Sequence, residues 1–220
     1  MAKGWEGTTD LPSVIPLFPL PNAVLFPGVP LPLHVFEPRY REMVQAVSQS
    51  DERIIGMVLL RGDWRKDYYG NPDVFPVGCA GRMLSVEPLA DGRSNILLQG
   101  VREFVIVDES HDRSYRRATV SWRAPAGGEL DPAFRRRIRD LVARFLGDRE
   151  PKLARKLLDD ASVSDELLVN FLCYALDFSP LEKQALLDAG SLVQRGTRLC
   201  EVVQFALEGG GAGGGDDWYH

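Results

Sequence analysis

The chain has 220 residues, of which 45% are hydrophobic and 26% charged, so it is long and apolar enough to bury a core. Its net charge of −5 shows no basic excess in either half, which argues against a dedicated nucleic-acid binder. Three widely spaced cysteines form no disulfide framework and favour a reducing compartment. No stretch approaches the roughly 20 apolar residues of a membrane span, and the N-terminus has no apolar signal core. We therefore expect a soluble cytoplasmic protein.

Residues 1–13 are predicted to form a flexible arm because they are mostly small and polar. Eight of the 15 prolines lie between Pro12 and Pro38, in an otherwise apolar stretch. Proline lacks a backbone donor and is disfavoured in central strands, so this stretch predicts short extended pieces at the edge of a sheet. Pro38 stands at the first position of a predicted helix. The predicted apolar face of this helix consists of Tyr40, Met43, Val44 and Val47.

Strand patterns dominate the chain from residue 53 to residue 124. Residues 53–60 form a nearly continuous apolar run, which predicts a strand buried on both faces. Residues 76–89 and 93–110 flank an Asp-Gly hairpin signal and contain glycines that indicate bulges. Residues 114–124 alternate in the manner of a half-exposed strand.

Helical patterns follow the linker-like residues 125–130. Four or five short helices with short connections predict a helical bundle over residues 131–208. One of them carries a capping box formed by Ser179 and Glu182. Residues 209–220 are predicted to form a flexible, glycine-rich tail. Strands first and helices afterwards favour an α+β fold over an alternating parallel sheet.

The most specific motif is IPLFPLPNAVLFPGVPLPLHVFEPRYREMV, at residues 15–44. It contains a Phe-Pro-Gly turn at residues 26–28 and the helix opening Phe-Glu-Pro-Arg-Tyr at residues 36–40. A second block, VGCAGRMLSVEPLADGRSNILLQGVREFVI at residues 77–106, contains the Asp-Gly hairpin and a Gly-Val-Arg step at residues 100–102. In this order the two blocks resemble the N-terminal domain of Lon proteases, which is also present in cereblon.

The resemblance implies a PUA-like β-barrel over residues 14–124, and the helices over residues 131–208 fit the family's helical extension by pattern. In Lon enzymes this domain binds substrates and precedes the ATPase. The resemblance therefore implies a non-catalytic module that binds exposed apolar segments of unfolded or degron-bearing polypeptides. A protease or a chaperone is the further partner that it suggests.

The sequence offers no complete catalytic site. None of its five lysines follows a glycine, so the Gly-Lys pair of a phosphate-binding loop is missing. The Ser-Lys dyad of the Lon family belongs to a domain outside the resemblance. The histidines at positions 34, 111 and 220 are isolated, without metal-ligand spacing. We therefore expect no catalytic residue, no metal and no cofactor, and nothing supports the alternative of a hidden hydrolase.

The loop at residues 61–75 combines aromatic and charged side chains between two predicted strands. Such a loop is either a contact surface or a lid that folds back on the barrel. At least four of its charged residues, Asp63, Arg65, Lys66 and Asp67, are expected to face water. With the proline-rich segment, it gives the candidate substrate-binding residues: Phe18, Leu20, Phe26, Trp64, Tyr68, Tyr69 and Phe75.

An alternative function is a PUA-like RNA-binding or regulatory module, since PUA-type barrels in other proteins bind RNA. The acidic composition weighs against it. The arginine cluster at residues 135–139 is either a solvated helix face or a site for an acidic partner.

Overall fold

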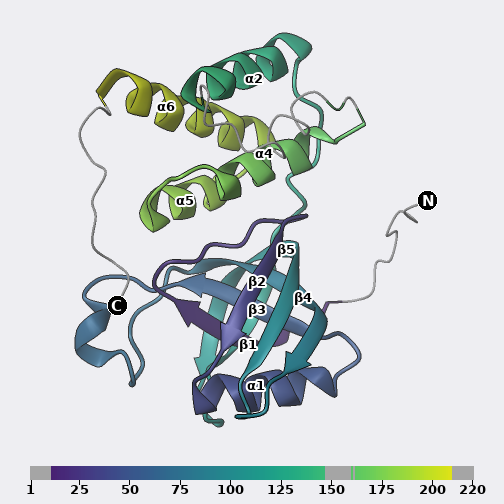
Figure 1. Cartoon of the computed structure of the whole chain (residues 1–220), viewed down its shortest axis with the longest axis vertical. Coiled ribbons are helices and arrows are strands. Elements are labelled where there is room, and N and C mark those ends of the chain that lie inside the picture. Colours follow the sequence, from purple (N-terminus) through teal and green to yellow (C-terminus); the bar gives the residue numbers. More distant parts are fainter. Residues whose placement is uncertain (1–10, 147–159, 161, 210–220) are drawn as a thin grey trace. The chain divides into compact units, whose positions relative to one another are not determined.

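A computed structural model describes residues 11–146, 160 and 162–209 (Figure 1). The chain divides into two compact units, one ending at Pro125 and the other beginning at Ala126. The first unit contains a sheet and the second contains helices, so the mixed α+β content is confirmed. Most of the predicted arm, nearly all of the predicted tail and the helical pattern at residues 151–159 lie outside the described residues.

Six strands form one sheet in the first unit. They are β1 (Val14–Leu20), β2 (Pro30–Val35), β3 (Ile54–Leu59), β4 (Val77–Pro88), β5 (Ser94–Ser110) and β6 (Arg117–Trp122). Their order is β2-β5-β4-β3-β1-β6, and β5 also pairs with β6. The long β5 does this by pairing with β2 along residues 94–99 and with β6 along residues 104–110. The series of paired strands β5-β4-β3-β1-β6 thus returns to β5. The PUA-like barrel itself stays a prediction.

The proline-rich β1 lies inside the strand order, so its predicted edge position was wrong. Its first half, Val14–Pro16, pairs with β6, and its second half, from Leu17 to Leu20, pairs in parallel with β3. Because each partner covers only half of the strand, prolines can occupy positions that a fully paired strand would disfavour. The other proline-rich strand, β2, does lie at an edge and pairs only with β5.

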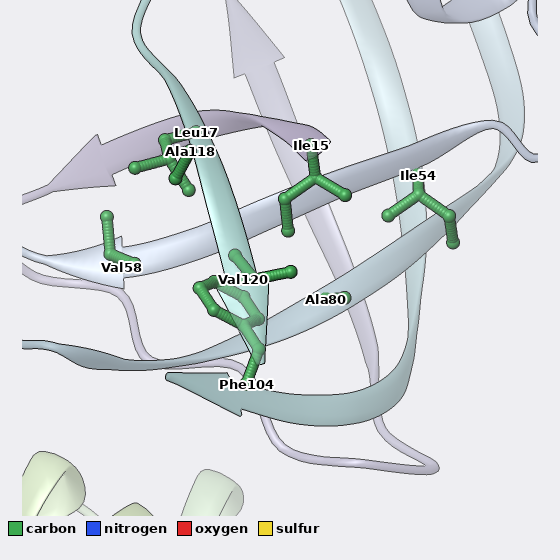
Figure 2. Close-up of a cluster of buried hydrophobic side chains, with 8 residues drawn as sticks. All are labelled: Ile15, Leu17, Ile54, Val58, Ala80, Phe104, Ala118 and Val120. Atoms are coloured by element: carbon green, nitrogen blue, oxygen red, sulfur yellow. The ribbon is translucent and has the colours of Figure 1, made fainter. Parts of the chain in front are cut away.

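Side chains from five strands meet in the core of the first unit (Figure 2). The cluster consists of Ile15 and Leu17 from β1, Ile54 and Val58 from β3, Ala80 from β4, Phe104 from β5, and Ala118 and Val120 from β6. Every residue of β3 is buried, as its apolar run predicts. A Cβ at Gly56 would lie 2.9 Å from the Phe104 ring, so this position requires glycine.

The two motif blocks of the sequence meet at the Phe-Pro-Gly turn. The Gly28 N–H donates to the Gly100 carbonyl (2.9 Å), and the Gly100 N–H donates to the Val29 carbonyl (2.9 Å). Gly28 has a positive φ of 79°, which favours glycine. A Cβ at Gly100 would overlap the Phe26 carbonyl oxygen, so glycine is also required on the other side of the contact.

Helix α1 (Pro38–Ser48) begins where the sequence predicts, with Glu37 as its N-cap residue and proline in its first turn. It lies across one end of the strands in Figure 1. Its four buried residues are those of the predicted apolar face.

The second unit contains the described helices α2 (Pro132–Leu146), α4 (Asp165–Ala175), α5 (Pro180–Leu187) and α6 (Leu192–Gly209). Helix α6 contacts each of the other three. The predicted capping box between Ser179 and Glu182 is present at the start of α5.

A buried arginine connects three of these helices. The guanidinium of Arg195 in α6 donates to the Leu186 carbonyl (3.0 Å) and to the Leu187 carbonyl (3.2 Å), both at the end of α5. It also donates to Oδ1 of Asn170 in α4 (2.6 Å). Carbonyls at a helix C-terminus lack intrahelical donors and carry partial negative charge, so a guanidinium satisfies them well.

Candidate functional site

A cleft of about 240 Å³ lies in the first unit beside the aromatic loop. Three segments provide most of its lining: the start of α1, loop residues 68–72, and, between β5 and β6, residue 111 with residues 113–116. Its charged and aromatic lining residues are Arg39, Tyr40, Tyr68, Tyr69, His111, Arg113, Tyr115 and Arg116. Guanidinium groups and tyrosine rings therefore dominate the cleft.

Glu37 and Arg39 of the helix-opening motif hold the loop against α1. The Tyr68 hydroxyl donates to Glu37 Oε1 at 2.7 Å, and Arg39 Nε donates to Glu37 Oε2 at 3.0 Å. Arg39 also donates to the Tyr68 carbonyl (3.2 Å), and its guanidinium carbon lies 4.7 Å from the centre of the Tyr40 ring. One carboxylate and one guanidinium thus fix both the backbone and the ring of Tyr68.

The two tyrosines at this junction are held in their neutral forms. Burial raises the pKa of Tyr40 to about 12. Burial, together with the hydrogen bond to Glu37, also raises the pKa of Tyr68. A neutral tyrosine donates a hydrogen bond, so the Tyr68–Glu37 contact persists throughout the physiological pH range.

Carboxylates near the cleft are already engaged. Arg116 Nε donates to Glu109 Oε2 at 2.8 Å, and the Arg116 guanidinium also reaches the Pro72 carbonyl at 2.7 Å. The Ser114 hydroxyl donates to Glu42 Oε2 at 2.6 Å. None of the lining residues is itself acidic. The cleft therefore presents positive charge.

The predicted aromatic loop contributes Tyr68 and Tyr69 directly to the cleft. Their ring centroids are 5.2 Å apart, and the Trp64 ring lies 5.7 Å from that of Tyr68. Tyr69 is 86% exposed, whereas Trp64 and Tyr68 are half-buried. A short 3₁₀ helix at Trp64–Asp67, which the sequence patterns did not predict, carries Trp64. Asp63, Arg65, Lys66 and Asp67 are exposed, as expected.

The other candidate residues do not line this cleft. Phe18 and Phe26 are buried in the core, and the Phe18 ring lies 4.3 Å from that of Tyr40. A buried ring offers little area to a partner in this conformation, and the role of Phe18 and Phe26 in a contact surface stays a prediction. Leu20 and Phe75 are half-buried at other positions along the chain.

Several cleft residues were not recognised from the sequence. The sequence indicates Arg39 only as part of a helix opening and Tyr40 only as part of an apolar helix face. His111 and Arg113 fall in a polar connection between strands, where sequence spacing gives no sign that they approach the aromatic loop. The available signal was Ser-Tyr-Arg at residues 114–116, because tyrosine and arginine are enriched at contact surfaces.

The arginines of α2 in the second unit have divided roles. Arg135 pairs with Asp165 and donates to the Val163 carbonyl (3.2 Å), so it is structural. Arg136 and Arg137 line an open groove between α2 and α6. The two interpretations of the arginine cluster, a solvated helix face and a site for an acidic partner, both stay predictions.

The described part of the chain contains no group of three or more His, Cys, Asp or Glu side chains suited to a metal ion. His34 is exposed and contacts Asn95 at 2.8 Å. Cys79, Cys173 and Cys200 are buried and form no disulfide. In residues 11–146, 160 and 162–209, no helix has the length and apolarity to span a membrane.

The family model of the ATP-dependent protease La (LON) substrate-binding domain matches residues 14–204. The chain belongs to this family. The match extends through both units, so the helices after residue 131 also belong to the Lon substrate-binding domain. The matched domain is the substrate-binding part of Lon, without the ATPase and peptidase domains.

Lon proteases are the curated relatives of this chain. The Lon protease of Cytophaga hutchinsonii is 28% identical over 204 residues, which are 88% of this chain and 24% of that protein. The Lon protease of Flavobacterium johnsoniae is 26% identical over 90% of this chain and 25% of its own length. The chain thus spans about a quarter of the length of the curated relatives it matches.

Two solved structures share the fold. The N-terminal domain of Mycobacterium avium complex Lon protease superposes with a TM-score of 0.69 at 16% identity, over 87% of this chain and 98% of that chain. The Lon N-terminal domain protein from Xanthomonas campestris gives a TM-score of 0.63 at 25% identity, with the same coverage. The resemblance to Lon N-terminal domains that the two motif blocks indicate is therefore confirmed.

Proposed function

We propose that this chain is a non-catalytic module that binds exposed apolar segments of unfolded or degron-bearing polypeptides. The observation that carries the proposal is the match of residues 14–204 to the Lon substrate-binding domain. The same evidence supports a protease or a chaperone as the partner that receives the bound polypeptide. Three cysteines that form no disulfide support the cytoplasm as its compartment.

The contact surface that we propose centres on Tyr69 and includes Trp64 and the neighbouring cleft. Tyr69 is a large ring that is 86% exposed, and it lines a concave site. Tyrosine and tryptophan provide contact area at little cost in side-chain entropy, which suits recognition of varied sequences. The anchoring of Tyr68 to Glu37 supports a preformed surface over a loose loop.

Strand addition to a free sheet edge is less well supported than binding at the cleft. Among the described strands, β2 lies at the end of the order. It carries Pro30 and Pro32 at positions paired with β5. A proline in a paired strand directs its missing donor to the open side, so this edge offers few N–H groups to an added strand.

Binding to an unfolded probe tests the proposal. Reduced, carboxymethylated α-lactalbumin remains unfolded, and the native protein provides the folded comparison. We expect the full chain to bind only the unfolded form. Tyr69→Ala should weaken binding by about 1–3 kcal/mol, the usual range for an interface aromatic, at little cost in stability. Leu84→Ala is the matched control, because Leu84 is also exposed but lies on β4 outside the cleft.

The result that would contradict the proposal is equal binding of the folded and unfolded probes, or no binding of either. If Tyr69→Ala binds the unfolded probe with unchanged affinity, polypeptide binding stands but the contact surface does not include Tyr69.

A second candidate is an RNA-binding or regulatory module with a PUA-like barrel, which the arginines and tyrosines of the cleft favour. RNA binding depends steeply on salt because each phosphate contact releases counterions. A steep fall in affinity for single-stranded RNA between low and physiological salt, with no binding of the unfolded probe, would establish this candidate instead.

A further inference from the structure

The charges of the cleft are unequally matched. Arg39 is paired with Glu37, and Arg116 is paired with Glu109. Arg113, in contrast, has neither an ion pair nor a hydrogen bond with any residue that the structure describes, and its side chain is exposed. The guanidinium of Arg113 is thus the cleft's unmatched positive group.

An aromatic surface lies in the same cleft as this charge. Tyr69 projects from loop residues 68–72, and Arg113 projects from residues 111–116, and both segments line the cleft. Both residues are exposed, so a polypeptide chain can pass over them without ending inside the cleft. A bound segment would therefore place one side chain at the guanidinium and a neighbouring side chain against the tyrosine ring.

We propose that Arg113 binds the carboxylate of an aspartate or glutamate side chain in the bound polypeptide, next to an apolar residue held by Tyr69. This inference rests on the proposed function. The planar guanidinium fork matches a carboxylate. The two other cleft arginines already pair with glutamates, each through one carboxylate oxygen. A single unmatched guanidinium suits one carboxylate better than the successive phosphates of RNA, which need a charged track.

Paired peptides test this assignment. Overlapping unphosphorylated peptides of α-casein are screened against the full chain, and each binder is resynthesised with Asn and Gln in place of Asp and Glu. We expect the acidic form to bind about fivefold more tightly or better at low salt, and the difference to shrink as salt is added. A third form, with the acids kept and the C-terminus amidated, should bind like the acidic form.

Variants of the chain assign the effect to one residue. Arg113→Gln should remove the preference for the acidic peptide, and Arg113→Lys should keep part of it because the charge remains. Arg117→Gln is the matched control: it removes one charge from the same region, where Arg117 pairs with exposed Asp112 outside the cleft lining. It should leave the preference unchanged.

Equal binding of acidic and amide peptides, or a preference that survives in Arg113→Gln, would overturn the inference and leave polypeptide binding standing. A preference lost only on C-terminal amidation would overturn it too, because the carboxylate would then be the chain terminus. Single-stranded RNA that binds more tightly than every peptide and requires Arg113 would replace the polypeptide ligand. If no peptide binds at all, the proposed function fails together with the inference.

Discussion

Tyr68→Phe removes one hydroxyl at the point where the aromatic loop meets α1. That hydroxyl donates to Glu37 Oε1 at 2.7 Å, and the Glu37 side chain is only 11% exposed. A hydrogen bond to a charged group contributes about 1.5–3 kcal/mol when buried. The Tyr68 ring is half-exposed and Glu37 keeps its pair with Arg39, so we expect the variant to lose about 1 kcal/mol of unfolding free energy at neutral pH.

The effect of this variant should depend on pH with a definite sign. The pKa of Tyr68 is raised above its ordinary value of about 10 by burial and by the hydrogen bond to Glu37. Below pH 10 the tyrosine is protonated in both the folded and the unfolded chain, so its full contribution is present. Above about pH 10 the unfolded chain loses this proton first, which favours unfolding. The advantage of the wild type over Tyr68→Phe should therefore shrink as the pH rises above 10.

Urea denaturation at about pH 7 and at about pH 11 measures this difference. Of the four tryptophans, only Trp218 falls in the second unit, so in a Trp218→Phe background tryptophan fluorescence reports on the unit that contains Tyr68. Tyr69→Phe is the control, because Tyr69 is 86% exposed and its hydroxyl makes no hydrogen bond with the described residues. Equal stability of Tyr68→Phe and Tyr69→Phe at neutral pH, or a wild-type advantage that grows above pH 10, would refute the reasoning.

Three further variants or reagents probe the rest of the chain. Gly100→Ala should destabilise the first unit by about 2 kcal/mol or more, because its Cβ overlaps the Phe26 carbonyl; Gly127→Ala, with no atom nearby, should be neutral in the same urea titration. Arg195→Met should lower the unfolding free energy of the second unit by about 3 kcal/mol, seen in helical circular dichroism, since the variant loses the buried hydrogen bonds that the guanidinium donates to Asn170 and to two carbonyls. Cys173 should react with Ellman's reagent only after unfolding, because burial raises the pKa of its thiol to about 12; rapid labelling of the native protein would contradict this.

Local features of this protein were predictable from its sequence alone. Helix α1 begins at Pro38 and buries the predicted face because proline position and 3.6-residue spacing are properties of a few adjacent residues. The capping box of α5 and the fully buried β3 follow from equally short patterns. The two motif blocks also sufficed to indicate the Lon substrate-binding domain.

Burial and proximity were decided only by the tertiary structure. Phe18 and Phe26 are candidate contact residues by sequence, and the structure buries both rings. Strand β1 pairs with both β3 and β6, which places it within the sheet. The sequence has no local signal for this, because strand partners lie far away in the chain.

The cleft is likewise formed by residues that lie far apart in the chain. Tyr68 and Glu37 are 31 residues apart in the chain, and Arg116 reaches a carbonyl 44 residues before it. Sequence patterns identify aromatic and charged residues but not which of them meet, because that depends on how the strands and α1 pack. The sequence therefore determined the elements, the family and the aromatic loop. Only the fold decided that an arginine from the β5–β6 connection lines the same cleft as that loop's exposed tyrosine.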